Sequence, residues 1–408
     1  MQRLRPDDHF LILLEGDETP MHIGSLIVLE VPDADRAAAA VRLRAHLVER
    51  LAVTPLLREL RRAPLSFDSD VWVRAGDVDF DRHVVVHRPD APIDDADLRA
   101  FVSQHVMIRL DLRRRPFLIH VLDGVGDRGG RGRVAMYVKV HHSVTDGVGF
   151  QTVLGLLSDD PIDPAMVPAP LRSEQELPTR HEWLAESVLR FRAEREDEPE
   201  RRAVRRATVE ALRDPALQRP ATPSLSLSGP TSTRRAYTAI ILPFGEMKSV
   251  ARALDATVND LFLALAGSAM RAYLIEIGDL PDLPLTTNSA RSYRRPEHGP
   301  FGNRIVAIHP HLATHLADPI ERLRAIQAAM SLEWRRTPLD EACSTSQRRR
   351  SDRSCDGASS PSASARAARS CQATSRCRMS LARTTSGRSP ASDSSPTTRR
   401  PYSAAAAR

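Results

Sequence analysis

The residues most able to do chemistry stand together at positions 141–147, where the chain reads HHSVTDG. His141 and His142 are followed by Asp146, four residues after the second histidine, and then by Gly147. A histidine can accept a proton near neutral pH because its ordinary pKa is about 6.5. The aspartate can fold back to fix the turn and the ring, and glycine permits backbone geometry or close packing that a side chain would prevent. The pattern favours a general base held in a turn.

Other interpretations of the same residues are open. A single histidine is more often structural or exposed than catalytic, and His141, His142 and Asp146 could instead bind a metal. HHxxxD, however, lacks the HExxH helix context and an obvious third ligand. A serine hydrolase would need a GxSxG turn, which does not accompany these histidines. A thiol nucleophile is excluded before residue 341, because all cysteines lie beyond it, without CxxC spacing: Cys343, Cys355, Cys371 and Cys377.

The motif needs a scaffold, and the flanking patterns supply one. Residues 134–140 alternate as a strand and residues 148–157 begin a helical pattern, so HHSVTDG falls at the turn between them. A second strand at 116–123 is joined to the first through a glycine-rich loop at 124–132. The same patterns predict a strand at 22–30 and helices at 33–51 and 94–110.

The length of 408 residues favours two domains, which we place at 1–160 and 235–340. Between them, residues 161–234 form a crossover linker with a proline-rich start and a solvated, densely charged helix at 180–213. The second block alternates again and, with the first, predicts an α/β (α+β) fold. Its expected strands are 236–242, 284–288 and 304–311, and its expected helices are 246–254, 258–278 and 319–334.

Residues 341–408 form a Ser/Arg/Ala-rich tail whose composition differs from the rest of the chain. It has no Val, Ile, Phe or Trp and a net charge of +9, whereas residues 1–340 carry −3. Such a segment buries too little apolar surface to fold, so we expect it to be disordered. The preceding part uses only two lysines, Lys139 and Lys248, as a GC-rich gene would, and a frameshift near codon 340 is therefore a hypothesis for the tail.

The same features limit the partners and the location of the protein. The basic charge belongs to the tail, and aromatics make up only 4% of the chain, so we expect no nucleic-acid partner. Residues 1–8 are polar and charged, without the apolar region of a signal peptide. The apolar run at 261–270 is shorter than the roughly 20 residues that a membrane-spanning helix needs. We therefore expect a cytoplasmic protein, soluble or peripheral to a membrane.

HHSVTDG resembles the HHxxxDG motif of the CoA-dependent acyltransferase superfamily, to which chloramphenicol acetyltransferase and peptide-synthetase condensation domains belong. Longer segments are similar to the bacterial wax ester synthase/diacylglycerol acyltransferase family. The resemblance extends over about residues 3–336, and the segments that carry it are FLILLEGDETPMHIGSL, DVDFDRHV, RLDLRRRPFLIHVLDG, TVNDLFLALAGSAMRAYL and FGNRIVAIHPHL.

The resemblance implies two chloramphenicol-acetyltransferase-like domains, here with the second incomplete, and an active site in a tunnel between them. His142 would be the general base that takes the proton from an acceptor hydroxyl as it attacks the acyl-CoA carbonyl, without an acyl-enzyme. His141 would support the turn and Asp146 would be structural. Asn259, of the pair Asn259-Asp260, would position the reacting centre, although an asparagine there also suits a helix cap. No cofactor or metal is implied.

The implied substrates are acyl-CoA and a diacylglycerol or long-chain alcohol, used at the inner membrane face or on lipid bodies. One alternative is a condensation-type enzyme that takes its acyl group from a carrier protein. Another is an inactive, truncated relative that only binds lipid. Two departures from the family motivate the second alternative. The Pro-Leu-Trp motif reads Pro116-Phe117-Leu118, and the final segment of the second domain has no counterpart after about Asp340.

Overall fold

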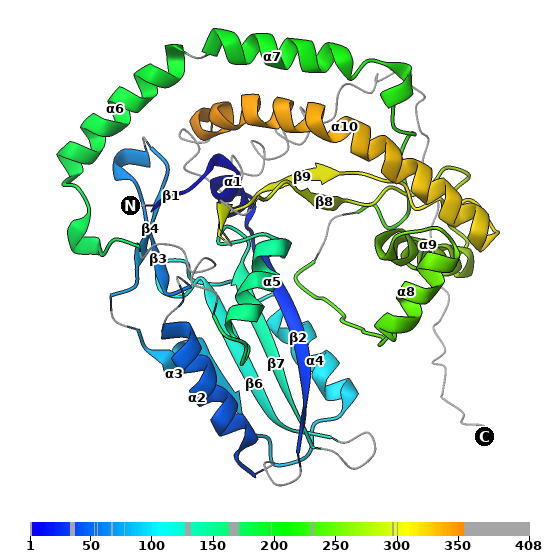
Figure 1. Ribbon diagram of the computed structural model, residues 1–408, viewed down its shortest axis with the longest axis horizontal. Helices are drawn as coiled ribbons and strands as arrows, with labels where there is room; N and C mark the ends of the chain where they lie inside the picture. Colours follow the sequence, from blue (N-terminus) through cyan, green and yellow to red (C-terminus); the bar gives the residue numbers. More distant parts are fainter. Residues whose placement is uncertain are drawn as a thin grey trace, which may run out of the picture.

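The computed structural model shows a mixed α/β molecule with two connected parts (Figure 1). It describes residues 2–32, 37–52, 54, 56–66, 68–76, 78–126, 132–162, 171–196, 198–229, 232–295, 298–299 and 301–354, without the side chains of residues 194, 196 and 343–354. The α/β (α+β) class expected from the alternating patterns is confirmed.

A four-stranded sheet carries HHSVTDG at the end of one of its central strands. Its strands, in the order β2-β7-β6-β5, are β2, His22–Val31; β7, Gly132–His141; β6, Phe117–Val125; and β5, Val84–His87. β7 pairs antiparallel with β2 and β6, whereas β5 pairs parallel with β6. The pairing continues to the end of β7, where His141 lies opposite His22 and Val140 lies opposite Phe117. The chain therefore enters the turn from a strand that is held on both sides.

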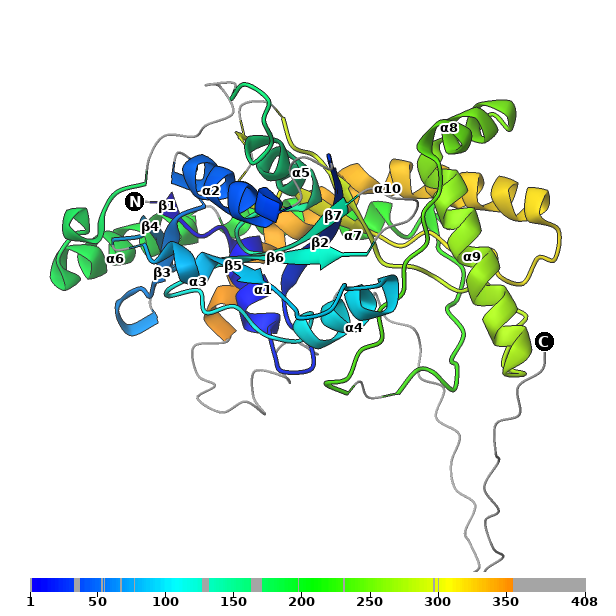
Figure 2. The ribbon, with the colours of Figure 1, turned by 90° about the horizontal axis from the view of Figure 1, so that it is seen from below.

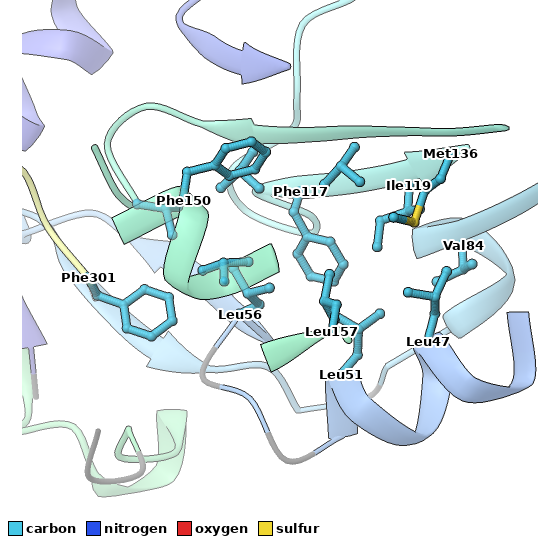
Figure 3. Packing of buried hydrophobic residues seen from close by; sticks show 14 of the residues in the cluster. Leu47, Leu51, Leu56, Val84, Phe117, Ile119, Met136, Phe150, Leu157 and Phe301 are labelled. Atoms are coloured by element: carbon cyan, nitrogen blue, oxygen red, sulfur yellow. The ribbon is translucent and has the colours of Figure 1, made fainter. Parts of the chain in front are cut away.

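One face of this sheet packs against two helices, α2, Ala39–Ala52, and α5, Gly147–Leu156. Alternate residues of β7, among them Met136 and Val138, point to this face and meet leucines of α2 (Figure 3). Burying one such side chain stabilises the fold by about 1.5–3 kcal/mol, so this cluster fixes β7 and α5 relative to each other. Phe301, from far along the chain, joins the same cluster.

The other face of the sheet is covered by α4, Asp95–His105, through Leu98 and Leu122. A capping box starts this helix, because the side chain of Asp94 accepts from Asp97 N while the Asp97 side chain accepts from Asp94 N. The helix ends at His105, earlier than the predicted residue 110.

A smaller three-stranded sheet lies beside the first. Its strands, in the order β1-β4-β3, are β1, Gln2–Arg3; β4, Val71–Arg74; and β3, Arg58–Arg61. Two helices of the first part lie outside this sheet: α1, Pro6–Leu14, contacts α10, Pro319–Ser354, and α3, Phe80–His83, contacts β5 and β6. Pro6 occupies the first turn of α1, where its missing N–H costs no hydrogen bond.

Two charged helices cross from the first part to the second: α6, Arg180–Glu196, and α7, Glu198–Ala211. They replace the single helix that the charge pattern predicted, and α7 runs along α10, Pro319–Ser354 (Figure 1). Just after α7, Arg219 binds Glu333 of α10 through two N–H···O bonds of 2.6 and 2.7 Å. The crossover is therefore anchored on the second part.

The second part has two further helices and a two-stranded sheet: α8, Phe244–Ala253; α9, Val258–Glu276; β8, Ser289–Ser292; and β9, Ile305–Ile308. Its core lies between α9 and α10 and includes Leu263, Leu323 and Ile326. Figure 2 shows α8 and α9 standing at one end of the molecule, away from the four-stranded sheet. The β8–β9 hairpin reaches back from them towards α1 (Figure 1).

Two predictions for the second part are wrong. Residues 236–242 form no strand, although their β-branched residues favour one, and Ile240 and Ile241 are 80% and 85% exposed. The strand expected at 284–288 begins only at Ser289, leaving an isolated bridge between Thr286 and His311. α10 extends to Ser354, into the first residues of the predicted tail, and residues 355–408 of that tail lie outside the described residues.

Candidate active site

The HHSVTDG turn is buried except at His142 and at its last residue, Gly147. His141, Ser143, Thr145 and Asp146 are each 0% exposed, whereas His142 keeps part of its surface accessible. The backbone fixes this arrangement, because His142 N donates to Met21 O at 2.8 Å as the chain leaves β7. Among the histidines and the aspartate of the motif, His142 alone is placed to meet a substrate.

The ring of His142 is held by an amide from the second part of the chain. His142 Nδ1 lies 3.0 Å from Asn303 Oδ1, and Asn303 Nδ2 donates to His142 O at 2.6 Å. Burial lowers the pKa of His142 below its ordinary value, while hydrogen bonds to its own carbonyl and to Asn303 act in the opposite direction. The imidazole is therefore neutral at neutral pH, as a general base must be.

Asn303 is itself fixed by a buried carboxyl of α1. Asp8 Oδ1 accepts from both Asn303 N, at 2.9 Å, and Asn303 Nδ2, at 2.7 Å. Burial raises the pKa of Asp8 to about 6, even though the hydrogen bonds from Asn303 pull it down. The preceding residue, Gly302, has a φ of +73°, a left-handed conformation that glycine adopts without strain.

Asp146 ties the motif to the second part of the molecule rather than to the histidine ring. Its Oδ1 accepts from Gly149 N at 2.9 Å and so caps α5. Its Oδ2 accepts from Arg294 Nη2 at 2.7 Å and from Arg304 N at 2.8 Å. The predicted contribution of Asp146 to the turn thus takes the form of a helix cap and a buried ion pair, and Asn303 orients the ring instead.

His141 faces inward and supports the turn from behind. Ser143 N donates to His141 Nδ1 at 3.1 Å, and Ser143 Oγ lies 2.6 Å from the same nitrogen. His141 Nε2 lies 3.6 Å from Glu15 Oε1, whose other oxygen accepts from Arg109 at 2.9 Å. Burial alone would raise the pKa of Glu15, but its pairing with His141 and Arg109 outweighs burial and lowers that pKa to about 2.

Ser143, His141 and Glu15 together have the composition of a nucleophile, base and orienting acid. The hydroxyl of such a triad must reach a substrate carbonyl. Ser143 and His141 are both 0% exposed, which prevents that approach. The serine-hydrolase interpretation is no stronger in the folded chain than in its sequence.

Neither of the two predicted reasons for a glycine at position 147, close packing or an unusual backbone conformation, applies in the structure. A Cβ built there would meet nothing within 4 Å, and its φ lies outside the left-handed region. Gly147 is exposed and starts α5 directly after the Asp146 cap. Close packing and an unusual backbone conformation therefore do not require glycine at this position.

Asn259 and Asp260 lie at the start of α9. Asp260 Oδ2 accepts from Thr257 N at 2.9 Å and from Thr257 Oγ1 at 2.7 Å, completing a capping box. Asn259 is exposed on the first turn of the helix. Within the described part of the chain, no hydrogen bond or ion pair joins either residue to His142, so their substrate-binding role stays a prediction.

Two other parts of the molecule could be considered as sites. A hollow of about 550 Å³ lies between β3 and β4 and residues 173–175, away from the motif, and its Arg61 is already paired with Glu59 and Glu174. Among the residues that the structure describes, no group of three or more His, Cys, Asp or Glu is placed to hold a metal ion. The polar groups that converge on an accessible base are those around His142.

Three of these groups, Asp8, Asn303 and Arg294, were not singled out from the sequence. Asn303 lies in the FGNRIVAIHPHL segment and Asp8 just before FLILLEGDETP, but nothing local marks either as a partner of residue 142. The available signal is a lone amide at the start of an otherwise apolar strand. Arg294 carries no local signal of this kind.

Comparisons with known proteins agree with the geometry. A family model described as the wax ester synthase/diacylglycerol acyltransferase catalytic domain matches residues 4–262. A protein of Mycobacterium tuberculosis named as a diacylglycerol O-acyltransferase is 30% identical over 350 residues, which are 79% of this chain and 66% of that relative. A second such protein from the same organism is 30% identical over 342 residues, covering 81% of this chain and 73% of its own length. The chain thus spans slightly less than two thirds of the first relative.

The fold has a solved counterpart as well. The wax ester synthase/diacylglycerol acyltransferase from Marinobacter aquaeolei VT8 superimposes with a TM-score of 0.57 at 24% identity, over 85% of this chain and 76% of that one. At this identity the match shows the fold alone. It supports the expected fold.

Proposed function

The chain belongs to the wax ester synthase/diacylglycerol acyltransferase family, and from that premise we propose that it transfers a long-chain acyl group from CoA to diacylglycerol or a fatty alcohol. The observation that carries the proposal is the accessible imidazole of His142, held in a buried turn by Asn303. Its two mycobacterial relatives are named as diacylglycerol O-acyltransferases, which supports diacylglycerol as the acceptor.

The reaction needs one acyl transfer and two proton transfers, to His142 and from it. His142 Nε2 takes the proton of the acceptor hydroxyl as its oxygen attacks the thioester carbonyl. The tetrahedral intermediate then collapses, the C–S bond breaks, and the proton on His142 passes to the leaving CoA thiolate. The products are an ester and CoA. General-base catalysis of this kind contributes about 10²–10⁴-fold, and positioning of the two substrates contributes more.

The neutral state of His142 suits this role. A base must be unprotonated before the reaction and must gain a proton during it. Burial lowers the pKa of His142, and this effect outweighs the opposing effects of its hydrogen bonds and of Asp146, so the neutral ring is present at pH 7. Asp146, the carboxylate closest in the motif, is committed to Arg294 and the cap of α5.

We also propose that the protein works at a lipid surface, where both acceptors reside. The support comes from exposed apolar side chains on α8 and α9. These two helices form one end of the molecule (Figure 2). α9 is also the described helix that is long and apolar enough to cross a membrane, with 28% of its apolar window buried. The exposed apolar set of α8 and α9 consists of Phe244, Val250, Phe262, Leu265, Tyr273 and Ile275.

The decisive experiment supplies purified protein with a radiolabelled long-chain acyl-CoA and either diacylglycerol or a fatty alcohol, and measures labelled ester. Replacing His142 with glutamine keeps a polar side chain but removes the base, so kcat is expected to fall by about 10²–10⁴-fold. His181→Gln is the matched control, because His181 is exposed on α6.

Other results of this experiment would favour a different function. Ester formation only from an acyl group on a carrier protein would identify the condensation-type enzyme. Lipid binding without any ester from either donor would leave the inactive binding protein. Full activity of His142→Gln would refute the role of the histidine.

A further inference from the structure

The hydrogen bonds of the His142 ring bear on which of its two nitrogens carries the proton. His142 Nδ1 lies 3.0 Å from one amide oxygen, Asn303 Oδ1. The ring also has a hydrogen bond with its own backbone carbonyl. Which nitrogen of a neutral histidine carries the proton is decided by the hydrogen bond that the other nitrogen makes. The orientation of the Asn303 amide therefore bears on whether His142 can act as a base.

The orientation of the Asn303 amide is fixed by its other contacts. Its Nδ2 lies 2.6 Å from His142 O and 2.7 Å from Asp8 Oδ1. The carbonyl oxygen can only accept, so the NH2 group must stand on this side whether or not Asp8 is ionised. Exchanging the amide atoms would place an oxygen against two oxygens and leave the contact with the carbonyl unpaired.

The orientation of the amide determines the tautomer of the ring. Asn303 Oδ1 can only accept a hydrogen bond, so His142 Nδ1 must be the nitrogen that carries the proton. Nε2 then has a free lone pair, and no hydrogen-bond partner of Nε2 occurs among the residues that the structure describes. We infer that Asn303, seated on Asp8, is a positioning residue that selects the Nε2-basic tautomer of His142, which rests on the proposed function of His142.

Asp8 gives the amide its rigidity. Its Oδ1 receives both the backbone and the side-chain N–H of Asn303, which locks the side chain to its own backbone. Asp8 is 3% exposed and comes from α1, so water does not compete for the amide. No residue of the HHSVTDG turn can replace it, because Asp146 is bound to Arg294 and Arg304.

The size of the effect follows from a known parallel. In a serine protease, removing the acceptor that fixes the histidine tautomer lowers kcat by about 10⁴-fold while leaving the geometry intact. Here the acceptor is a neutral amide rather than a carboxylate. We expect Asn303→Ala to lower kcat by about 10²–10³-fold, with a much smaller change in KM.

The test reads the tautomer directly. Protein labelled with ¹⁵N in its histidines gives ring-nitrogen signals by NMR, and the His142 signals are those absent from His142→Gln. Wild type is expected to show a protonated Nδ1 and an unprotonated Nε2. Asn303→Ala should lose this preference, whereas the exposed Asn288→Ala should keep it together with full kcat.

Two further variants separate positioning from folding. Asp8→Asn keeps an oxygen that can accept from Asn303, so His142 should keep its proton on Nδ1. Asp8→Ala removes this acceptor, so the preference of His142 for that tautomer should be lost.

The inference is overturned if wild type carries its proton on Nε2, or if Asn303→Ala keeps both the tautomer and kcat. The NMR spectrum requires no turnover, so it reports the tautomer of His142 independently of the assay of ester formation. A protein with the expected tautomer that makes no ester from any donor would refute the proposed function and leave the inference standing.

Discussion

At the scale of single residues, the members of the HHSVTDG motif have different surroundings. His142 keeps accessible surface, whereas His141 and Asp146 are buried and hydrogen-bonded to other residues of the protein. The sequence could predict the turn that carries His142, because strand and helix patterns flank it. It could not predict Asn303, which lies 161 residues away and meets His142 only in the folded chain.

Glu15 should make the protein acid-sensitive. Its pKa is about 2 in the folded state against an ordinary value of 4.5, so its ionised form stabilises the fold. That contribution, at most about 3 kcal/mol, is fully present above pH 4.5 and disappears as the pH falls towards 2. Urea unfolding should therefore show Glu15→Gln to be destabilised at pH 7 and the loss to shrink at pH 3. The exposed Glu18→Gln should match wild type at both values, and equal losses for Glu15→Gln at both would contradict the assignment.

At the scale of helices and strands, prediction succeeded where an element finds its partner nearby. β7 and α5 are adjacent in sequence and share one core, so the alternation of β7 and the apolar start of α5 sufficed. Residues 236–242 have a strand-like sequence but pair with no strand of the described chain, and they stay extended and exposed. A high β-propensity does not produce a strand where no neighbouring strand is available for hydrogen bonding.

Gly267 tests how closely α9 approaches the rest of the second part. A Cβ at this position would lie 2.5 Å from Leu312 O, a backbone atom that cannot move aside easily. Alanine normally favours a helix over glycine by about 1 kcal/mol. Here we expect Gly267→Ala instead to destabilise the protein by about 1–3 kcal/mol, measured as a lower urea midpoint.

The matched control for that substitution lies in α5. A Cβ at Gly155 would meet nothing within 4 Å, so Gly155→Ala should leave stability unchanged or raise it by up to about 1 kcal/mol. If both variants were stabilised, the contact between α9 and Leu312 would not constrain the helix.

At the scale of the whole molecule, the two parts interlock at the active site. Gly302 N donates to Val144 O at 2.7 Å, and Phe301 packs into the core of the first part. Arg294 pairs with Asp146 at 2.7 Å while 8% of the arginine side chain is exposed. The base and the residues that orient it therefore come from both parts.

The exposed apolar set of α8 and α9 should govern lipid binding. Phe262 is 60% exposed, and Phe262→Asp should weaken flotation with phosphatidylcholine vesicles containing diacylglycerol by about tenfold, since burying a phenylalanine contributes about 1.5–3 kcal/mol. Leu189→Asp, a 65% exposed leucine on α6, is the control that should float like wild type. Equal binding of all three proteins would remove the support for a lipid surface at this end. A concentration-dependent dimer broken by Phe262→Asp would assign the set to self-association instead.

The Asp8–Asn303–His142 arrangement can form only late in the synthesis of the chain. A ribosome releases residue 142 long before residue 303, because 161 positions separate them, and domains generally form in order from the N-terminus. A nascent chain that already displays the full HHSVTDG turn thus lacks the amide that prepares its histidine. The polypeptide therefore lacks the contact that orients His142 until the later half has emerged and docked.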